Sequence, residues 1–222
     1  MIRSRLLTFS AGEGKASALY LCPANARALL VFGHGAGAGM RHGFMEEMSQ
    51  RLSSRGIATF RYQFPYMEKR IRRPDPQPVL LDTVRSAVEE AKRLSGTLPL
   101  FAGGKSMGGR MTSLAAASEG MEGVRGIIFF GFPLHPAGRP GTDRAKHLSE
   151  VRLPMLFLAG TRDKLSDLNL LRAICTALPQ AELHIVEGGD HSFNVLKRSG
   201  RTPDQVFESL AGTVADWIAR IA

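Results

Sequence analysis

The segment Gly103-Gly-Lys-Ser-Met-Gly-Gly109 contains a serine, Ser106, with glycines two residues before and two residues after it. A serine on a sharp strand-to-helix turn projects its hydroxyl above a sheet. Neighbouring backbone segments approach this turn so closely that only glycine fits at the positions flanking the serine. The apolar stretch 100–102 before the motif and the helix-forming stretch 111–117 after it supply that setting. We therefore expect Ser106 to be a nucleophile at a helix N-terminus that favours negative charge.

A serine hydroxyl is a weak nucleophile unless a base removes its proton, and the base needs a carboxylate that fixes its tautomer. Asp163 follows a predicted strand at 155–159, and His191 lies in a glycine-rich loop after a predicted strand at 183–186. The carboxyl ends of parallel strands meet at one edge of a sheet, where catalytic groups collect. The sequence thus predicts Asp163 as the acid and His191 as the base.

Other acidic and histidine side chains lie near these positions in the chain. Asp167 stands at a predicted helix start, where a capping role is expected, and Asp190 is adjacent to His191, so it is expected to brace the loop. His184 lies within a strand. His135 and His147 follow the strand at 126–130 and are candidates to line a pocket.

Acyl transfer builds negative charge on a carbonyl oxygen, which backbone N–H groups must stabilise. One donor is expected to be Met107, the residue after the nucleophile. The second is expected from the loop at 34–39, with Ala36 as the donor and Gly37 as the nearest alternative. Together these two N–H groups form the predicted oxyanion hole.

Two nucleotide-binding patterns resemble parts of the chain and fail on spacing. A phosphate-binding loop that ends at Gly104-Lys-Ser106 requires glycine at position 99, which is Pro99. A dinucleotide fingerprint at Gly33-His-Gly-Ala-Gly-Ala-Gly39 lacks the GxGxxG spacing and the acidic residue after the next strand, where Arg61 and Tyr62 stand. Nucleotide binding is therefore disfavoured.

Short apolar runs alternate with segments of helical periodicity along the whole chain. This pattern predicts an α/β fold with a mostly parallel sheet and helices on both faces. We expect an antiparallel edge hairpin at 6–9 and 18–21, and further strands at 28–32, 57–62, 98–102, 126–130, 155–159 and 183–186. Helices are expected at 44–55, 79–94, 107–117, 168–178 and 205–221, within a single domain spanning 1–222.

Two connections bear on access to the predicted site. About two dozen residues separate the strands at 126–130 and 155–159, too few for a large helical cap, so the site is expected to be open. The proline-rich stretch 73–78 is expected to be a loop. The loop 63–74 leaves a strand end, and its aromatic residues with Arg70, Arg72 and Arg73 could bind an anionic or aromatic acyl group, or the arginines simply remain solvated.

The bulk composition is that of a globular chain. Its 222 residues carry a formal net charge of +9, but the basic residues are scattered and no aromatic platform accompanies them, so we expect no nucleic-acid partner. No apolar run is long enough to cross a bilayer, and no signal segment is evident. Cys22 and Cys175 lie far apart in no metal-binding spacing, so two free thiols and a cytoplasmic location are expected.

With these motifs, and with Phe64-Pro-Tyr-Met67 and Gly131-Phe-Pro-Leu-His-Pro136, the chain resembles a group of small lidless α/β-hydrolase-like proteins. The group includes testis-expressed proteins and the hydrolase-like domain of a histone-acetyltransferase NSL-complex subunit; dienelactone hydrolases are similar more distantly. The order serine, acid, histidine is that of α/β-hydrolases. The resemblance implies a serine hydrolase scaffold without a metal or organic cofactor. Dienelactone hydrolases carry a cysteine nucleophile, whereas Ser106 stands here.

The function predicted from these observations is hydrolysis of a small ester, thioester or related acyl compound. The alternative is a non-catalytic interaction module that keeps the fold, and a third possibility is a peptidase. The presence of Ser106, Asp163 and His191 together favours the hydrolase, because a scaffold has no need of all three. Neither the substrate nor the oligomeric state follows from the sequence.

Overall fold

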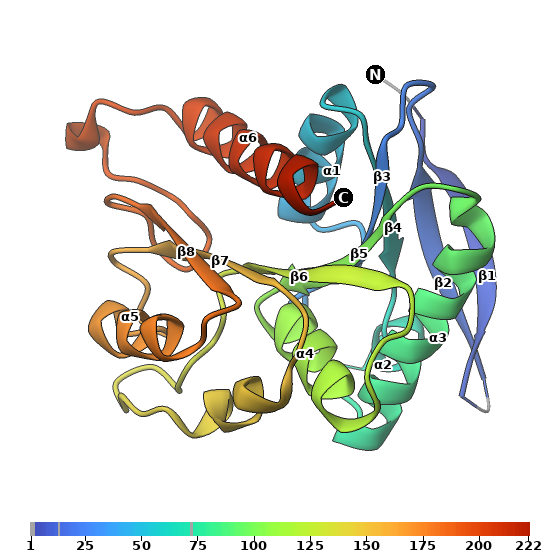
Figure 1. The fold of residues 1–222 in the computed structure, drawn as a ribbon, viewed down its shortest axis with the longest axis horizontal. Helices are drawn as coiled ribbons and strands as arrows, with labels where there is room; N and C mark the ends of the chain where they lie inside the picture. The colour runs from blue at the N-terminus through green and yellow to red at the C-terminus, as the bar shows by residue number, and fades with distance from the viewer. Residues whose placement is uncertain (1–2, 13, 72) are drawn as a thin grey trace.

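The computed structural model describes residues 3–12, 14–71 and 73–222. Within them, eight strands form one sheet in the order β1-β2-β4-β3-β5-β6-β7-β8 (Figure 1). Strands β3 to β8 run parallel, and the hairpin β1–β2 joins the edge of β4 in antiparallel fashion. The strands are β1 Arg5–Ala11, β2 Gly14–Leu21, β3 Ala28–Gly33, β4 Ile57–Tyr62, β5 Leu100–Lys105, β6 Val124–Phe130, β7 Met155–Gly160 and β8 Ala181–Val186.

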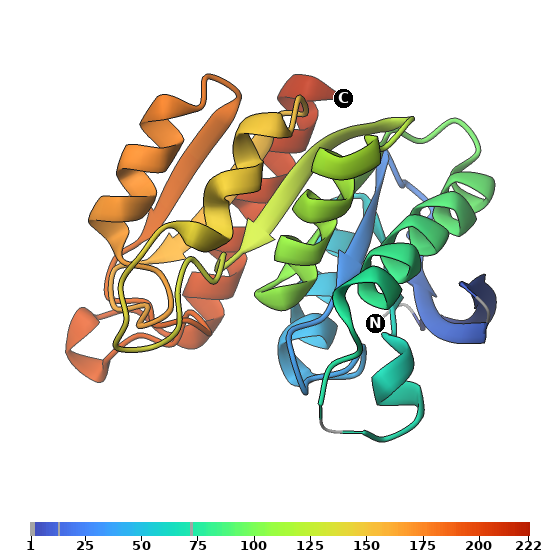
Figure 2. The same cartoon turned by 90° about the horizontal axis from the view of Figure 1, so that it is seen from below.

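Helices cover both faces of the sheet, as the alternating pattern predicts. Helices α1 and α6 lie on one face, and α3, α4 and α5 lie on the other (Figure 1). The helices are α1 Gly43–Ser54, α2 Pro65–Glu68, α3 Gln77–Ser95, α4 Met107–Glu119, α5 Leu168–Ala177 and α6 Pro203–Ile221, with 3₁₀ helices η1 Asp143–Glu150 and η2 Lys197–Ser199. Figure 2 shows η1 between α4 and α5. The predicted fold class is confirmed.

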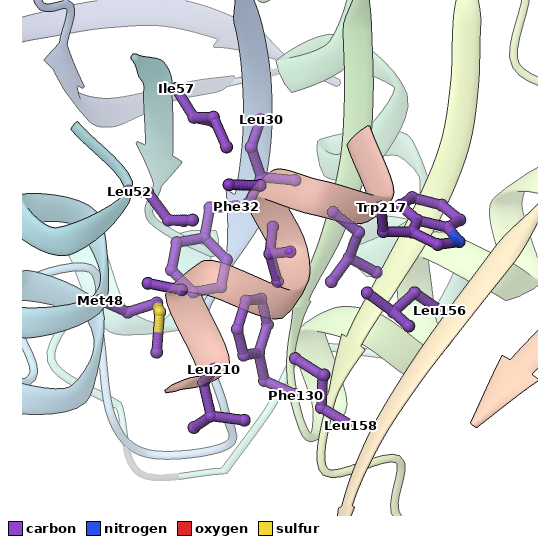
Figure 3. Packing of buried hydrophobic residues seen from close by; sticks show 14 of the residues in the cluster. Leu30, Phe32, Met48, Leu52, Ile57, Phe130, Leu156, Leu158, Leu210 and Trp217 are labelled. Carbon is purple, nitrogen blue, oxygen red and sulfur yellow. The ribbon is translucent and has the colours of Figure 1, made fainter. Parts of the chain in front are cut away.

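Burial explains why the central strands carry few polar residues. Every residue of β3, β4, β5 and β7 is buried, because helices pack on both sides. Between the sheet and the α1–α6 layer, Phe32 and Phe130 meet Met48 of α1 and Leu210 of α6 (Figure 3). Trp217 is buried in the same layer, and its indole N–H donates to Glu182 Oε1 at 3.0 Å.

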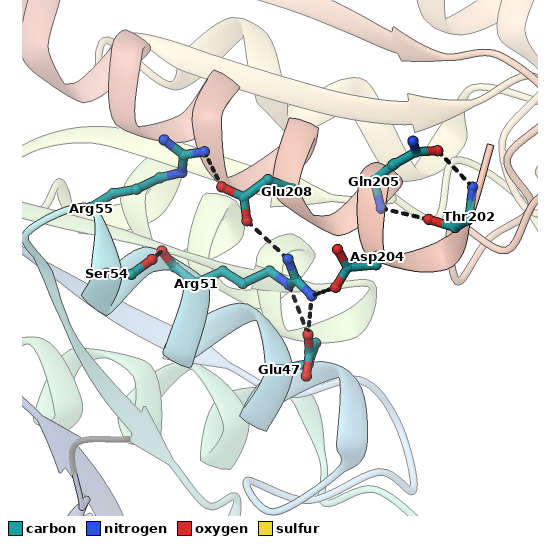
Figure 4. Close-up of polar contacts among 8 residues, drawn as sticks. All are labelled: Glu47, Arg51, Ser54, Arg55, Thr202, Asp204, Gln205 and Glu208. Carbon is teal, nitrogen blue, oxygen red and sulfur yellow. Dashed lines mark hydrogen bonds and ion pairs between the residues drawn. The ribbon is translucent and has the colours of Figure 1, made fainter.

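Arginines of α1 join carboxylates of α6 at the surface of this layer (Figure 4). The Arg51 guanidinium contacts Asp204, Glu208 at 2.9 Å and Glu47 at 2.6 Å, and Arg55 contacts Glu208. These carboxylates are roughly half exposed or more, so each pair contributes about 1 kcal/mol or less. The network joins α6 to α1.

Strand β5 extends beyond its predicted end. The glycines at 103 and 104 indicate a turn after 102, but the strand continues to Lys105. Neighbouring backbone leaves no space for a side chain at Gly103 or Gly104. A Cβ on Gly103, for example, would lie 2.1 Å from the carbonyl oxygen of Ile128 in β6. The glycines thus permit close strand packing, and the turn begins only at Ser106.

The connection after β4 is more ordered than predicted. Residues 65–68 form helix α2, and α3 begins at Gln77, within the stretch expected to be a loop. Pro78 fits there because the first turn of a helix leaves its N–H groups unpaired, so proline removes no hydrogen bond. Leu80, Val84, Ala87, Val88 and Ala91 of α3 are buried, as their helical spacing predicts.

The remaining differences lie at element ends. The edge strands β1 and β2 are longer than the predicted segments at 6–9 and 18–21, and α6 begins two residues early, with a capping box between Thr202 and Gln205. Residues 131–154 between β6 and β7 hold only loop and η1, so the prediction of no large cap is confirmed. The structure shows Cys22 and Cys175 as free cysteines.

Candidate active site

Ser106 occupies the turn between β5 and α4. Its backbone has φ 51° and ψ −114°, a conformation that costs a non-glycine residue free energy. The Ser106 N–H donates to the Phe130 carbonyl at 3.1 Å. A Cβ on Gly104 or Gly108 would lie 2.4 Å or 2.3 Å from the Gly33 carbonyl oxygen, so neither position accepts a side chain. The surrounding chain therefore enforces the strained turn.

The structure brings Ser106, His191 and Asp163 together in one chain of hydrogen bonds. His191 Nε2 lies 2.9 Å from Ser106 Oγ, and His191 Nδ1 lies 2.7 Å from Asp163 Oδ2. The other carboxylate oxygen of Asp163 accepts the Leu165 N–H at 2.8 Å. A proton on Nδ1 facing the carboxylate leaves Nε2 free to accept the serine proton. This arrangement is able to activate a hydroxyl for attack on a carbonyl.

The three side chains differ in their exposure to solvent. The Asp163 side chain is fully buried, whereas that of His191 is 23% exposed, and Ser106 is partly exposed. The loops that carry the acid and the base are packed together: Arg162 N–H donates to the Gly189 carbonyl at 2.8 Å. A small molecule can thus reach Ser106 from solvent, while the carboxylate stays shielded from water.

The neighbouring carboxylates have the structural roles expected of them. Asp167 caps α5, accepting from the N–H groups of Asn169 and Leu170. Asp190 braces the histidine loop, accepting from the N–H groups of Ser192 and Asn194. The carboxylate that the His191 ring binds is that of Asp163.

His135 and His147 do not join this group. Both ring nitrogens of His135 bind backbone groups, with Nδ1 at 2.8 Å from the Pro136 carbonyl and Nε2 accepting the Asp167 N–H at 2.8 Å. His147 Nε2 is bonded to Ser113 Oγ at 2.8 Å, and burial lowers its pKa to about 4. These bonds give both histidines a role in positioning loops, and the suggestion that they line a pocket stays a prediction.

The loop after β3 passes beside Ser106. A Cβ on Gly35 would lie 3.7 Å from Ser106 Cβ, and the Gly37 N–H is occupied by the Tyr66 hydroxyl at 3.0 Å. The N–H groups of Ala36 and Met107 have no acceptor among the residues that the structure describes. These two donors are therefore available to a ligand, and Gly37, the alternative donor, is not.

His34 fixes the loop after β3 in place, a role that the sequence motifs do not indicate. Its ring is fully buried, with Nδ1 donating to the Gly35 carbonyl at 2.8 Å and Nε2 accepting the Phe64 N–H at 3.1 Å. Burial lowers the pKa of His34 to about 4, so the ring is neutral and keeps this tautomer. No local spacing signals the contact, because Phe64 lies 30 residues away along the chain.

The loop at 63–74 has a different role from the suggested one. Phe64 and Tyr66 are fully buried, and they hold the loop after β3 rather than face a substrate. Arg70 and Arg73 are exposed to solvent, and Arg72 lies outside the described residues. The aromatic part of this hypothesis is therefore wrong.

Lys105 is the second residue that the motif alone did not reveal. Its Nζ donates to the His191 carbonyl oxygen at 2.6 Å and lies 5.7 Å and 5.8 Å from the ring centres of Phe44 and Phe193. The side chain is 8% exposed, and burial lowers its pKa to about 8, although the charges of Asp163 and Asp190 act in the opposite direction. Lys105 thus ties the nucleophile turn to the histidine loop.

This buried lysine predicts a pH dependence of stability. Because the pKa of Lys105 falls from 10.5 in the unfolded chain to about 8 in the fold, the folded lysine loses its proton first as the pH rises. Folding is therefore disfavoured by this group below pH 8, and the penalty declines between pH 8 and 10.5. We expect the free energy of unfolding of wild type, measured by urea titration relative to Lys105→Met, to rise across that window. A difference that stays flat from about pH 7 to 10.5 would contradict the shifted pKa.

Two further features concern the described residues as a whole. None of their helices combines the length and the apolar character needed to cross a membrane. No group of three or more His, Cys, Asp or Glu side chains among them is arranged to hold a metal ion.

Solved structures of other proteins share this fold. Dienelactone hydrolase from Anabaena variabilis matches with a TM-score of 0.77 and 19% identity, over 99% of this chain and 98% of that chain. A serine hydrolase without a lid from Xanthomonas campestris matches with a TM-score of 0.75 and 20% identity, over 98% and 94%. Est1E from Butyrivibrio proteoclasticus with bound ferulic acid matches with a TM-score of 0.74 and 16% identity, over 97% and 98%.

The family comparison is consistent with the fold and with the spacing of the motifs. The resemblance to the testis-expressed and NSL-subunit group remains a prediction, whereas the broader family is shown by a match to its model over residues 26–219. The chain belongs to the α/β-hydrolase domain family.

Proposed function

We propose that this protein is a serine hydrolase that cleaves a small ester or thioester through an acyl-enzyme. The observation that carries the proposal is the continuous chain of hydrogen bonds from Ser106 through His191 to the buried Asp163, at 2.9 Å and 2.7 Å. It lies where strand ends and a helix N-terminus meet, which is the place of the catalytic group in the α/β-hydrolase fold.

In the first half of the reaction, Ser106 Oγ attacks the acyl carbonyl carbon while His191 Nε2 takes the hydroxyl proton. Asp163 stabilises the positive charge that forms on the imidazole and keeps Nδ1 protonated. Collapse of the tetrahedral intermediate breaks the bond to the leaving group, which receives the proton from His191. The acyl group remains on Ser106.

The negative charge of the tetrahedral intermediate needs donors that are already in place. The N–H groups of Met107 and Ala36 are the proposed donors. Met107 follows Ser106 in the chain, Ala36 follows Gly35, which passes close to Ser106, and neither N–H has an acceptor among the described residues. His34 and Tyr66 hold the Ala36 loop in position. Such fixed donors commonly account for factors of about 10² to 10³ in kcat each.

In the second half, a water molecule enters from the exposed side of His191 and attacks the acyl carbon. His191 removes a proton from this water and then returns it to Ser106 as the bond to the acyl group breaks. The products are a carboxylic acid and the free enzyme. An open site suits this step, because water and a small acyl group reach Ser106 without a cap having to move.

The test is hydrolysis of 4-nitrophenyl esters from acetyl to octanoyl, a phenyl thioacetate and ethyl ferulate. We expect saturable turnover of at least one compound, with a burst of about one nitrophenol per protein for a nitrophenyl ester whose deacylation is slower than its acylation. Ser106→Ala is expected to remove turnover and any burst, and Ser192→Ala, which changes an exposed serine beside His191, is expected to keep them. The absence of turnover and burst in folded wild type would instead favour the non-catalytic interaction module.

A further inference from the structure

Arg110 lies one helical turn after Ser106. The Arg110 N–H donates to the Ser106 carbonyl at 3.1 Å, so the two residues are stacked on one face of the first turns of α4. Side chains in a helix lean toward its N-terminus, and this direction brings the guanidinium back toward the end that carries the nucleophile. Arg110 is therefore a neighbour of the site that the proposed reaction does not use.

Arg110 also differs from the other arginines whose Nε is buried. Four arginines have a buried Nε without a hydrogen-bond partner within the described chain: Arg55, Arg61, Arg85 and Arg110. The first three bind a carboxylate through their terminal nitrogens. Arg110 has no acceptor for any part of its guanidinium among the described residues. Figure 4 shows one of the paired arginines, Arg55, with Glu208.

A second arginine, Arg144, lies close to Arg110. Arg144 of η1 reaches the Pro133 carbonyl with Nη1 at 3.5 Å, and it too has no carboxylate partner in the described part of the chain. Burial, and then the positive charge of Arg144, lower the pKa of Arg110. The loop that contains Pro133 follows β6, whose last residue, Phe130, accepts the Ser106 N–H. Ser113 lies one turn after Arg110 and is bonded to His147, which lies one turn after Arg144, so the contact between α4 and η1 brings the two arginines near each other.

The histidine beside this pair adds no further positive charge. His147, bonded to Ser113 on the same side of α4, has a pKa lowered to about 4, first by burial and then by the charge of Arg110, so it is neutral. Two like charges close together, one of them half-buried, oppose folding unless an anion binds between them. Arginine presents paired donors that suit a carboxylate or a phosphate.

We propose that Arg110 and Arg144 form an anion subsite beside Ser106, so that the preferred substrate is an ester with a carboxylate or phosphate group on its acyl or alcohol part. This inference rests on the proposed hydrolase function and names its substrate class. An anion held there would accept hydrogen bonds from both guanidiniums while the ester carbonyl lies at Ser106.

The experiment compares esters that differ in charge. Mono-4-nitrophenyl succinate carries the anion on the acyl part and is compared with 4-nitrophenyl butyrate; 4-acetoxybenzoate carries it on the alcohol part and is compared with phenyl acetate. For each pair, the ratio of kcat/KM for the anionic and the neutral ester is measured in wild type, Arg110→Gln, Arg110→Lys, Arg144→Gln and Arg125→Gln. Arg125 is exposed near the start of β6, at the opposite end of the strand from Phe130, and its replacement matches the loss of charge.

For at least one pair, we expect wild type to favour the anionic ester, and the ratio to fall about tenfold in Arg110→Gln and in Arg144→Gln. Arg110→Lys should recover part of the preference, and Arg125→Gln should keep the wild-type ratio. Thermal unfolding establishes that each variant is folded. A ratio that is equal in wild type and Arg110→Gln, or that falls equally in Arg125→Gln, would overturn the anion subsite and leave the hydrolase intact. A folded wild type that cleaves none of the four esters and is not labelled at Ser106 would overturn the hydrolase itself.

Discussion

Replacing Asp163 by asparagine is expected to lower kcat about 10⁴-fold while the protein stays folded. The carbonyl oxygen of the new amide can keep the hydrogen bond from the Leu165 N–H, which turns the amide nitrogen toward His191 Nδ1. The amide then donates to Nδ1 and forces the ring proton onto Nε2. In that tautomer His191 cannot accept the Ser106 proton. The measurement is kcat for the best ester, with thermal unfolding to establish that the variant is folded.

Two matched variants separate this effect from a general loss of charge. Asp167→Asn and Asp190→Asn each remove one carboxylate close in sequence to the acid or the base, but those carboxylates bind only backbone or asparagine N–H groups. Both are expected to keep kcat within about tenfold of wild type, since an asparagine oxygen still accepts from N–H groups. A larger loss in either of them than in Asp163→Asn would show that the acid is assigned to the wrong residue.

The largest expected effect on stability is that of Gly108→Ala. The new methyl group would lie 2.3 Å from the Gly33 carbonyl oxygen and 2.8 Å from that of His34, so α4 and β3 must separate. Overpacking against backbone of this kind costs about 3 kcal/mol or more. For a chain of this size that corresponds to a decrease in Tm of roughly 6 to 12 °C. Differential scanning calorimetry measures it directly.

Gly212→Ala is the matched control, because it changes a second helical glycine. Its methyl group would meet nothing closer than Arg55 Nη2 at 3.7 Å, an ordinary contact. Alanine is the better helix former by about 1 kcal/mol, so Tm should stay the same or rise slightly. If Gly108→Ala were as stable as Gly212→Ala, the close approach of α4 and β3 would be disproved.

The parts of the site that are local in sequence were predictable. Glycines spaced around Ser106 require only that a strand, a sharp turn and a helix follow one another, and all three leave local patterns. Asp163 and His191 each follow an apolar strand, and the carboxyl ends of parallel strands lie at one edge, so their meeting with Ser106 follows from topology.

The residues that fix these groups in place were not predictable, because their contacts are long-range. Lys105 binds the carbonyl of His191, 86 residues away, and His34 binds the N–H of Phe64 across 30 residues. Nothing in the local spacing of a lysine or a histidine indicates such partners. The strand end at Lys105 was missed for a related reason: glycines that allow close packing look the same in sequence as glycines that make turns.

Labelling with a fluorophosphonate probe reports directly on Ser106, because the probe reacts with a serine only when that serine is activated. We expect one phosphonate per protein, on the peptide that contains Ser106. We also expect no labelling of Ser106→Ala and a strong loss of labelling in His191→Ala, while Ser192→Ala is labelled like wild type. Folded wild-type protein that stays unlabelled, or a label on another serine, would contradict the assignment of Ser106 as an activated nucleophile.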